Sequence, residues 1–300
     1  MNKQRIIRFL RKLSGFIATL PLIFSFILSY FQVTPADYGE KLRFDDKGEF
    51  CALVLAGLLE GEGGFSQKTK EYINDLLIES KPDLVILGGN NIAPQPIATD
   101  LFMASTMNII DEYTALFDNG KTYFTALFGD YDMASLFDKT AQLKRYMRSK
   151  YFVGGIAHTD SLYTLYNRKK GLCGNFRITV FAEDKPAYYL YIMDYRGGEI
   201  PSAQQSWFEG GNADLPSVVF SFKSLYAWDD NKTEYLLYNE NVKAYVSMGD
   251  WANEGQDNAE AVLIKTPLIG KYSAEGSVQR EYRAKKIVLS KRGGLTVIDY

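Results

Sequence analysis

The sequence predicts an α/β protein with one folded body that follows an N-terminal membrane segment. Three observations lead to this prediction. A long uncharged run lies near the N-terminus, strand-length apolar runs alternate with helical patterns in the first half of the body, and strands dominate after residue 160. The chain has 300 residues, of which 46% are apolar, so it is long enough to bury one large core.

The charged side chains exclude one class of function. The chain carries 34 basic and 36 acidic residues, spread along its length, for a net charge of -2. Nucleic-acid-binding domains need a one-sided positive field, which this distribution does not offer. We therefore expect no nucleic-acid partner.

The N-terminus is typical of a membrane anchor. A basic segment, 1–12, precedes the uncharged run LSGFIATLPLIFSFILSYF at 13–31. A membrane helix needs roughly 20 apolar residues, whereas the apolar part of a cleaved signal has about 7 to 15. The alternative is a long signal peptide cut after Ala36, which would make the protein secreted.

Basic residues on the amino side of a span keep that end in the cytoplasm. We therefore expect a single-pass membrane protein whose body lies on the extracytoplasmic side. The expected boundaries are a cytoplasmic segment 1–12, a transmembrane anchor 13–31, a linker 32–41 and a folded domain 42–300.

Strands and helices alternate in the first half of the body. The apolar run CALVLAG is of strand length, and the helical spacing of SQKTKEYINDLLIES follows it. Such alternation favours a sheet that is covered on both faces. The predicted elements are a strand at 51–57, a helix at 66–80, a strand at 83–89, a helix at 97–118, a strand at 121–129 and a helix at 133–149.

The second half is rich in strands. One helix interrupts them in IPSAQQSWFEGG, where Pro201 suits the first turn and Gly210 and Gly211 end it. The predicted strands are 161–167, 175–181, 187–194, 217–222, 242–249, 259–265 and 284–290.

Two cysteines, Cys51 and Cys173, are the only ones in the chain. They form no metal-binding pattern such as CxxC, which excludes a structural zinc site built from cysteine. A disulfide between them and two buried free thiols both fit the sequence.

Taken in order, several segments resemble the calcineurin-like metallophosphoesterases, in the branch related to purple acid phosphatases. The likeness runs from about residue 42 to residue 290, and it lies in the ordered set rather than in any one segment. The segments are LRFDDKGEFCALVLAGLLEG, PDLVILGGNN, FTALFGDYD, GNFRITVF, YYLYIMDYRGG, IPSAQQSWFEGG, VVFSFKSL and YVSMGDWAN.

The resemblance implies a four-layer α/β/β/α sandwich of two mixed sheets, with metal ligands on loops at the carboxyl ends of the strands. It also implies two metal ions held by imidazoles and a bridging carboxylate, which activate water against a phosphate ester.

The residues at the family's motif positions do not match that chemistry. The family has metal-binding Asp, His and Asn side chains there. In chain order this sequence has Gly57 and Leu59 at the first motif, Asn90 at the second, Asp130 and Tyr131 at the third, Phe222 at the fourth, and Asp250 and Ala252 at the fifth.

The whole chain contains one histidine, His158. A dinuclear centre of this type needs several imidazoles, so we expect no metal cofactor, and we assign no catalytic residue. A neutral amide at Asn90 also avoids burying a carboxylate without a cation. His158 itself fits a surface or capping role better than that of a base, since no nucleophile accompanies it.

An alternative uses the carboxylates that remain. Asp130, Asp132 and Asp250 are oxygen ligands, which suit a single Mg²⁺ or Ca²⁺ ion. Against this, we expect Asp130 and Asp132 to cap the helix that begins near Met133, because carboxylates are common at helix starts.

Aromatic residues beside polar ones, as in YLYIMDYRGG and FKSLYAWDD, suit a surface that contacts a protein or a glycan, although strands use the same residues in ordinary packing. The sequence thus predicts a membrane-anchored pseudo-phosphoesterase that acts as a binding or scaffolding module. The alternative is a phosphoesterase that uses one oxygen-ligated cation. The sequence indicates neither a ligand nor an oligomeric state.

Overall fold

A computed structural model describes most of the body. The described residues are 42–61, 64–103, 105–160, 162–195, 200–211, 215–223, 226–229, 232–235, 239–248, 262–272 and 278–300. The expected cytoplasmic segment, anchor and linker, 1–41, lie outside them, and so do Asp250 and Ala252. Within the described part of the chain, no helix has both the length and the apolar character that a membrane span requires.

One mixed sheet is built from both ends of the body. Its strand order is β15-β14-β1-β2-β3. The strands β1, β2 and β3 run parallel, whereas β14 is antiparallel to both β1 and β15. Their bounds are β1 (Glu49–Leu55), β2 (Leu84–Leu87), β3 (Phe124–Ala126), β14 (Lys285–Ser290) and β15 (Leu295–Asp299).

The second mixed sheet has the order β11-β10-β7-β6-β5-β4. Its strands β6, β7, β10 and β11 run parallel, and β4 and β5 complete it as antiparallel neighbours. The bounds are β4 (Leu162–Asn167), β5 (Leu172–Ala182), β6 (Lys185–Met193), β7 (Ser217–Ser221), β10 (Val242–Met248) and β11 (Val262–Thr266).

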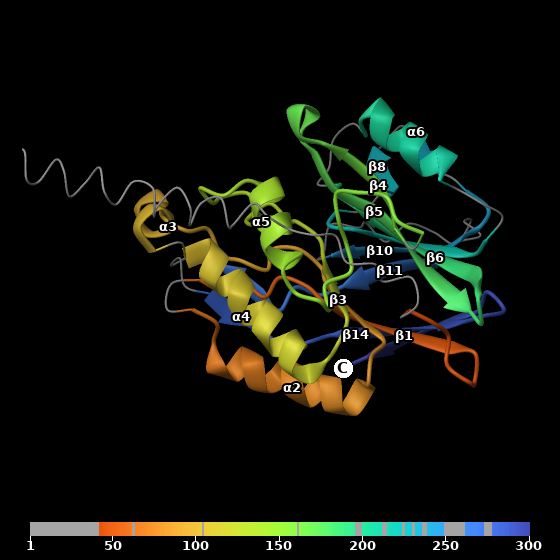
Figure 1. The fold of residues 1–300 in the computed structure, drawn as a ribbon, viewed down its shortest axis with the longest axis horizontal. Coiled ribbons are helices and arrows are strands. Elements are labelled where there is room, and N and C mark those ends of the chain that lie inside the picture. Colours follow the sequence, from red (N-terminus) through yellow and green to blue (C-terminus); the bar gives the residue numbers. More distant parts are fainter. Residues whose placement is uncertain are drawn as a thin grey trace, which may run out of the picture. The chain divides into compact units, whose positions relative to one another are not determined.

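Helices cover the outer faces of the two sheets (Figure 1). On the side of the first sheet, Phe117 of α4 stacks on Phe124 of β3 at 4.6 Å between ring centroids. On the side of the second sheet, Trp207 and Phe208 of α6 pack on Tyr191 of β6. The helices are α2 (Gln67–Ser80), α3 (Ile97–Met103), α4 (Ser105–Gly120), α5 (Lys139–Tyr146) and α6 (Ser202–Gly210).

The main core lies between the two sheets. Alternate residues of a strand point to opposite faces, so Ala52 and Val54 of β1 join this core, together with Ile178 of β5 and Val218 of β7. Both faces of β1 are buried, which explains its continuous apolar sequence. The predicted α/β sandwich of two mixed sheets is confirmed.

Several predicted elements differ in extent. The helix expected at 97–118 is divided into α3 and α4, and the one expected at 133–149 is limited to α5. Asp138 is the N-cap of α5, because its side chain accepts a hydrogen bond from the Ala141 amide at 2.8 Å. Our expectation that Asp130 and Asp132 cap that helix is therefore wrong.

Several short elements were not predicted from the sequence. These are β15, a 3-10 turn η1 (Arg168–Lys170), and two hairpins formed by β8 (Tyr226–Asp229) with β9 (Lys232–Tyr235) and by β12 (Gly270–Tyr272) with β13 (Val278–Arg280). Cys51 and Cys173 are both buried free thiols.

Candidate functional site

The carboxyl ends of β1 and β2 stay joined beyond the strands themselves. The Gly57 amide donates to the Gly89 carbonyl at 2.8 Å, and the Leu59 amide donates to the Asn90 carbonyl at 3.0 Å. Gly57, Leu59 and Asn90 all have positive φ angles, of 64°, 51° and 50°. Leu59 adopts this left-handed conformation only at some strain, which indicates that the surrounding contacts impose it.

Asn90 connects the second strand end to the third. Its side-chain Oδ1 accepts a hydrogen bond from the Tyr131 amide at 2.9 Å, and the residue is buried. Asparagine tolerates a left-handed backbone better than most residues. The amide at position 90 therefore holds two loops together.

Asn91 supports the same region from the next position. Its Nδ2 donates to the Leu127 carbonyl at 3.1 Å, and its own carbonyl accepts from the Tyr113 hydroxyl at 2.8 Å. Burial raises the pKa of Tyr113 well above its ordinary value, and the nearby Glu60 carboxylate adds to this shift. Tyr113 thus acts as a hydrogen-bond donor in this region.

Asp132 is a buried carboxylate whose two oxygens both have partners. Oδ1 accepts from the Ile92 amide at 2.9 Å, and Oδ2 accepts from the Gly129 amide at 2.7 Å. Burial raises the pKa of Asp132 to about 6, because desolvation outweighs the backbone hydrogen bonds that favour the charged form. Its neighbour Asp130 is half exposed and forms an ion pair with Lys223 at 3.3 Å.

Apolar side chains of the opposite sheet lie against the glycines at the strand ends. A Cβ atom added to Gly89 would lie 2.8 Å from Cδ2 of Phe222, and one added to Gly88 would lie 2.7 Å from Sδ of Met248. Phe222 is 1% exposed and Met248 is completely buried. The glycines at the end of β2 are therefore packed directly against the side chains of Phe222 and Met248.

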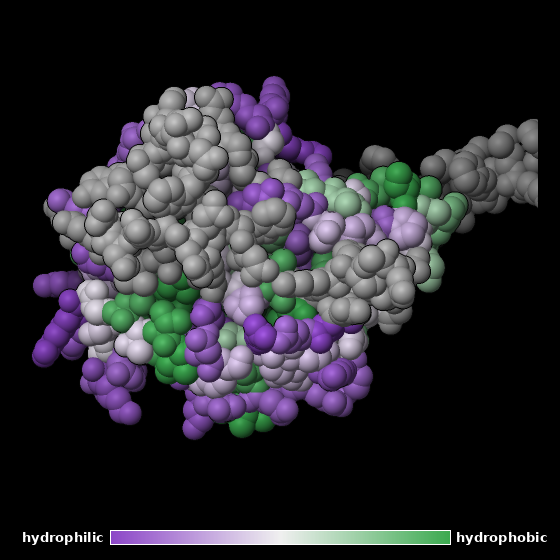
Figure 2. Space-filling model, turned by 180° about the vertical axis from the view of Figure 1, so that it is seen from behind, coloured by the Kyte–Doolittle hydropathy of each residue, from purple (hydrophilic) through white to green (hydrophobic). Residues whose placement is uncertain are grey.

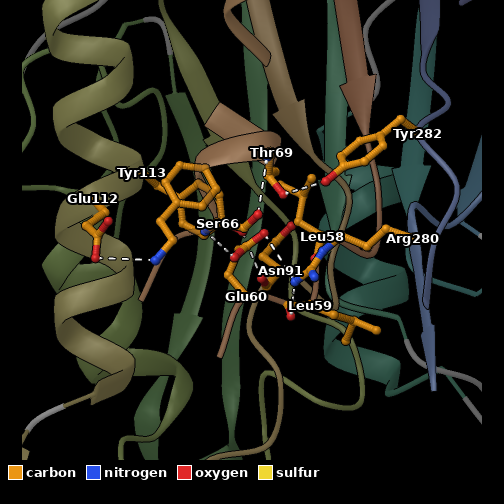
Figure 3. A network of polar contacts seen from close by, with 11 residues as sticks. Leu58, Leu59, Glu60, Ser66, Thr69, Asn91, Glu112, Tyr113, Arg280 and Tyr282 are labelled. Atoms are coloured by element: carbon orange, nitrogen blue, oxygen red, sulfur yellow. Dashed lines mark hydrogen bonds and ion pairs between the residues drawn. The ribbon is translucent and has the colours of Figure 1, made fainter. Parts of the chain in front are cut away.

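A second group of polar side chains surrounds Glu60, just beyond β1 (Figure 3). Glu60 is 1% exposed, and its Oε1 lies 3.3 Å from a guanidinium nitrogen of Arg280 in β13. Arg280 also donates to the carbonyl oxygens of Leu58 and Leu59, at 3.3 and 3.0 Å. The guanidinium thus fixes the loop in which Leu59 has its strained backbone.

Glu60 also reaches the start of α2. Its Oε2 accepts from the Ser66 amide at 2.7 Å, and Ser66 is the N-cap of that helix. Thr69 in the first turn of α2 lies 3.3 Å, hydroxyl to hydroxyl, from Tyr282. The sequence did not predict the pair of Glu60 and Arg280, because nothing local marks an arginine more than two hundred residues away as a partner.

His158 has a structural role. Its Nδ1 accepts a hydrogen bond from the Thr164 amide at 3.0 Å, and its ring stacks on Tyr163 at 5.1 Å between centroids. This agrees with the surface role expected from the sequence.

The structure brings most of the predicted motif positions together. Gly57, Leu59 and Asn90 are linked by the backbone contacts above, Tyr131 bonds to Asn90, and Phe222 lies against Gly89, next to Asn90. Asp130 reaches this region through Lys223, which follows Phe222. Asp250 and Ala252 lie outside the described residues.

These side chains do not fit the dinuclear centre that the family resemblance implies. Gly57, Leu59 and Phe222 offer no side-chain ligand atom, and the Asn90 oxygen is already bonded to a backbone amide. Among the described residues, no three His, Cys, Asp or Glu side chains are grouped so that they could hold a metal ion. No reaction step through paired metals can be derived from this site.

No family model and no curated protein sequence matches the chain. Solved structures that it resembles include a dimetal phosphatase from Danio rerio, with 10% identity over 84% of this chain and 99% of that one and a TM-score of 0.48. GAP50, described as the anchor in the inner membrane complex of Plasmodium, has 11% identity over 84% of each chain and a TM-score of 0.49.

A novel archaeal phosphodiesterase has 8% identity over 84% of this chain and all of that one, with a TM-score of 0.36. Phosphoesterases are thus among the solved structures that the chain resembles, as the sequence motifs led us to expect. At these identities and TM-scores the likeness concerns the course of the chain and says nothing about activity.

Proposed function

We propose that the protein is a membrane-anchored, extracytoplasmic binding or scaffolding module built on a phosphoesterase-like fold, and that it does not hydrolyse phosphate esters. The observation that supports this most strongly is the packing of Phe222 against Gly89. In the implied family, metal ligands stand at this position and at the adjacent strand end. Here a buried aromatic ring and an amide stand there instead.

Two of the carboxylates that remain are already engaged. Both oxygens of Asp132 accept backbone hydrogen bonds, and the charge of Glu60 is paired with Arg280. A carboxylate that is satisfied in this way loses those bonds if it turns to a cation or a substrate. The contacts therefore favour a role in holding the loops over a role in chemistry.

The membrane part of the proposal rests on the sequence of 1–31, with its basic start and its long uncharged run. Its test is the addition of protease to intact cells. We expect the body to be degraded while a tag at the N-terminus survives. A body that survives in intact cells but not in lysed ones contradicts the extracytoplasmic location.

Catalysis is tested with the full chain in a mild detergent. We expect no hydrolysis of p-nitrophenyl phosphate or of bis-p-nitrophenyl phosphate with Mg²⁺, Mn²⁺, Ca²⁺ or Zn²⁺, while the unfolding transition shows that the protein is folded. Turnover that disappears in the variants Asp130→Ala and Asp250→Ala would instead establish the single-cation phosphoesterase, in which Asp130, Asp132 and Asp250 hold one Mg²⁺ or Ca²⁺ ion.

A binding module should also have a partner. Crosslinking in the native membrane, followed by purification through the N-terminal tag, is expected to recover a defined protein or glycoprotein in stoichiometric amount. Recovery of the chain alone would favour a passive structural domain.

A further inference from the structure

The balanced charge of the whole sequence hides one local excess of positive charge. Residues 138–170 contain eight Lys and Arg residues but only two Asp and no Glu, whereas the whole chain has 34 basic and 36 acidic residues. This segment includes α5, β4 and the turn η1 that joins β4 to β5. The structure divides its basic side chains into two groups.

Two of the eight are buried in ion pairs. Lys139 pairs with Asp194, which follows β6, and the Lys139 side chain is 11% exposed. Arg145 pairs with Asp111 of α4, and the Arg145 side chain is 8% exposed. These pairs attach α5 to the second sheet on one side and to α4 on the other, and their positive charges are neutralised within the body.

The other six basic side chains form a group that we name the basic surface. Its members are Lys144, Arg148, Lys150, Arg168, Lys169 and Lys170. Lys144 is half-buried and the other five are exposed. A carboxylate of α4 borders this group, since Asp118 accepts a hydrogen bond from Ser149 Oγ. The basic residues still outnumber the acidic ones on this side of α5.

An ion pair joins the two parts of the basic surface. Nη2 of Arg168 lies 3.5 Å from Oδ2 of Asp138, the N-cap of α5. The turn between β4 and β5 therefore lies beside the start of α5, as can be followed in Figure 1. Hydrophilic side chains project from the same edge of the body, at the top of Figure 2. Because α5 has 8 residues and covers about 12 Å, Arg168 and Arg148 lie at opposite ends of an elongated surface.

The chemistry of this surface indicates an anionic partner. Like charges on neighbouring positions, such as Lys144 and Arg148, repel one another, and a partner of opposite charge relieves that repulsion. A guanidinium group binds a sulfate or a carboxylate through two parallel hydrogen bonds, and lysine adds a point charge. Because the charges extend along α5 and beyond it, they fit a chain of anionic groups better than a single small anion.

The composition of the surface distinguishes between kinds of polyanion. Among the described residues, none of the exposed large apolar side chains belongs to 138–150 or 162–170. A protein interface usually has an apolar core, and proteins that bind single-stranded nucleic acid stack its bases on aromatic rings. A polysaccharide that carries an acidic group on most of its sugars can bind through charge alone.

We propose that the basic surface binds an acidic polysaccharide that has sulfate or carboxylate groups along its length. The inference deepens the proposed binding function and rests on the extracytoplasmic location, where such polysaccharides occur. It adds the chemical class of the partner and the face of the body that binds it.

The test measures the binding of a fluorescein-labelled heparin oligosaccharide to the full chain in a nonionic detergent with EDTA, by fluorescence anisotropy. The surface variant combines Arg148→Gln, Lys169→Gln and Lys170→Gln. The matched control removes three exposed charges elsewhere on the body, in Lys47→Gln, Lys291→Gln and Arg292→Gln. We expect the dissociation constant to rise at least about tenfold in the surface variant and less than about twofold in the control. Equal losses in the two variants would contradict the assignment to this surface, and so would the absence of binding in the original chain.

Two further measurements define the partner. The plot of log affinity against log salt concentration should be less steep in the surface variant than in the original chain, because fewer counterions are released. A single-stranded oligonucleotide with the same number of charges should bind the original chain more weakly than the heparin oligosaccharide does. Equal affinity for the two would contradict a polysaccharide as the partner.

The outcome is independent of the tests of the proposed function. Binding that the surface variant loses supports the basic surface even if the protease experiment places the body in the cytoplasm, in which case the proposed location fails. Absence of binding in a chain that is extracytoplasmic and inactive contradicts the basic surface and leaves the proposed function in place.

Discussion

The ring of Phe222, which follows strand β7 of the second sheet, lies directly over Gly89 at the end of β2 in the first sheet. A Cβ atom at position 89 would lie 2.8 Å from Cδ2 of that ring and 2.8 Å from the backbone nitrogen of Gly129. Glycine is required here for space as well as for its positive φ of 89°. The two sheets therefore meet at the strand ends that carry the predicted motif positions.

This contact predicts the effect of a single methyl group. Gly89→Ala should lower the free energy of unfolding by about 3 kcal/mol, because overpacking and the left-handed backbone both act against it. Chemical denaturation of the full chain in detergent measures the effect.

The control is Gly171→Ala, where φ is also positive, at 67°, but nothing lies within 4 Å of the added Cβ. It should lose only about 1 kcal/mol. Equal losses for the two variants would show that Phe222 does not restrict position 89.

The buried carboxyl of Asp132 predicts that the free energy of unfolding depends on pH. Its pKa is raised from 3.8 to about 6 in the folded protein, so the folded state binds the proton more tightly than the unfolded chain does. The contribution of this carboxyl to stability is thus greatest below pH 4 and declines by about 3 kcal/mol as the pH rises through 6.

In Asp132→Asn this decline should be absent. The unfolding free energy of the original chain should therefore fall relative to that of the variant by about 3 kcal/mol between pH 4 and pH 7. Denaturation curves across that range test it. Asp130 lies two residues away, is half exposed and forms an ion pair with Lys223, so Asp130→Asn should leave the decline in place. A constant difference between the original chain and Asp132→Asn would show that Asp132 titrates normally.

The ion pair of Glu60 and Arg280 predicts that removing the arginine alone destabilises the protein more than removing both charges. Arg280→Met leaves the Glu60 carboxylate buried without a counter-charge and should cost about 3 to 5 kcal/mol of unfolding free energy. Adding Glu60→Gln to that variant should restore part of the loss.

Arg283→Met serves as the control, since its ion pair with Glu281 is exposed on both sides and should contribute less than about 1 kcal/mol. If the two arginine variants were equally stable, Arg280 would have no special role in fixing the loop at 58–60.

The two cysteines predict the behaviour of a thiol reagent. Burial raises the pKa of Cys51 to about 11 and that of Cys173 to about 12, so neither is a thiolate at pH 8. The native chain should react with dithionitrobenzoate very slowly, and two thiols per chain should appear on denaturation without reductant. Failure to find them until reductant is added would mean that the cysteines form a disulfide.

Sequence patterns predicted most of the strands because β1, β2 and β6 are apolar runs of strand length between clear turns. They failed at α5, where the turn residues 133–137 have a helical spacing but precede the true cap, Asp138. They also missed β15, whose residues are mostly half-buried or exposed and so lack a strong apolar pattern.

At the site, the sequence identified which positions lack a metal ligand but not what takes the ligands' place. The contact of Met248 with Gly88 and that of Arg280 with Glu60 join residues more than 150 positions apart. Local patterns carry no information about such pairs, because only the packing of one sheet on the other creates them.

We expect these strand ends to hold no pair of metal ions. Anomalous diffraction from crystals of the protein soaked in manganese tests it most directly. We predict no pair of anomalous peaks between the loops at 57–60, 88–92 and 129–132. Two adjacent peaks there, with the Phe222 side chain displaced, would show that the strand ends do bind paired metal ions.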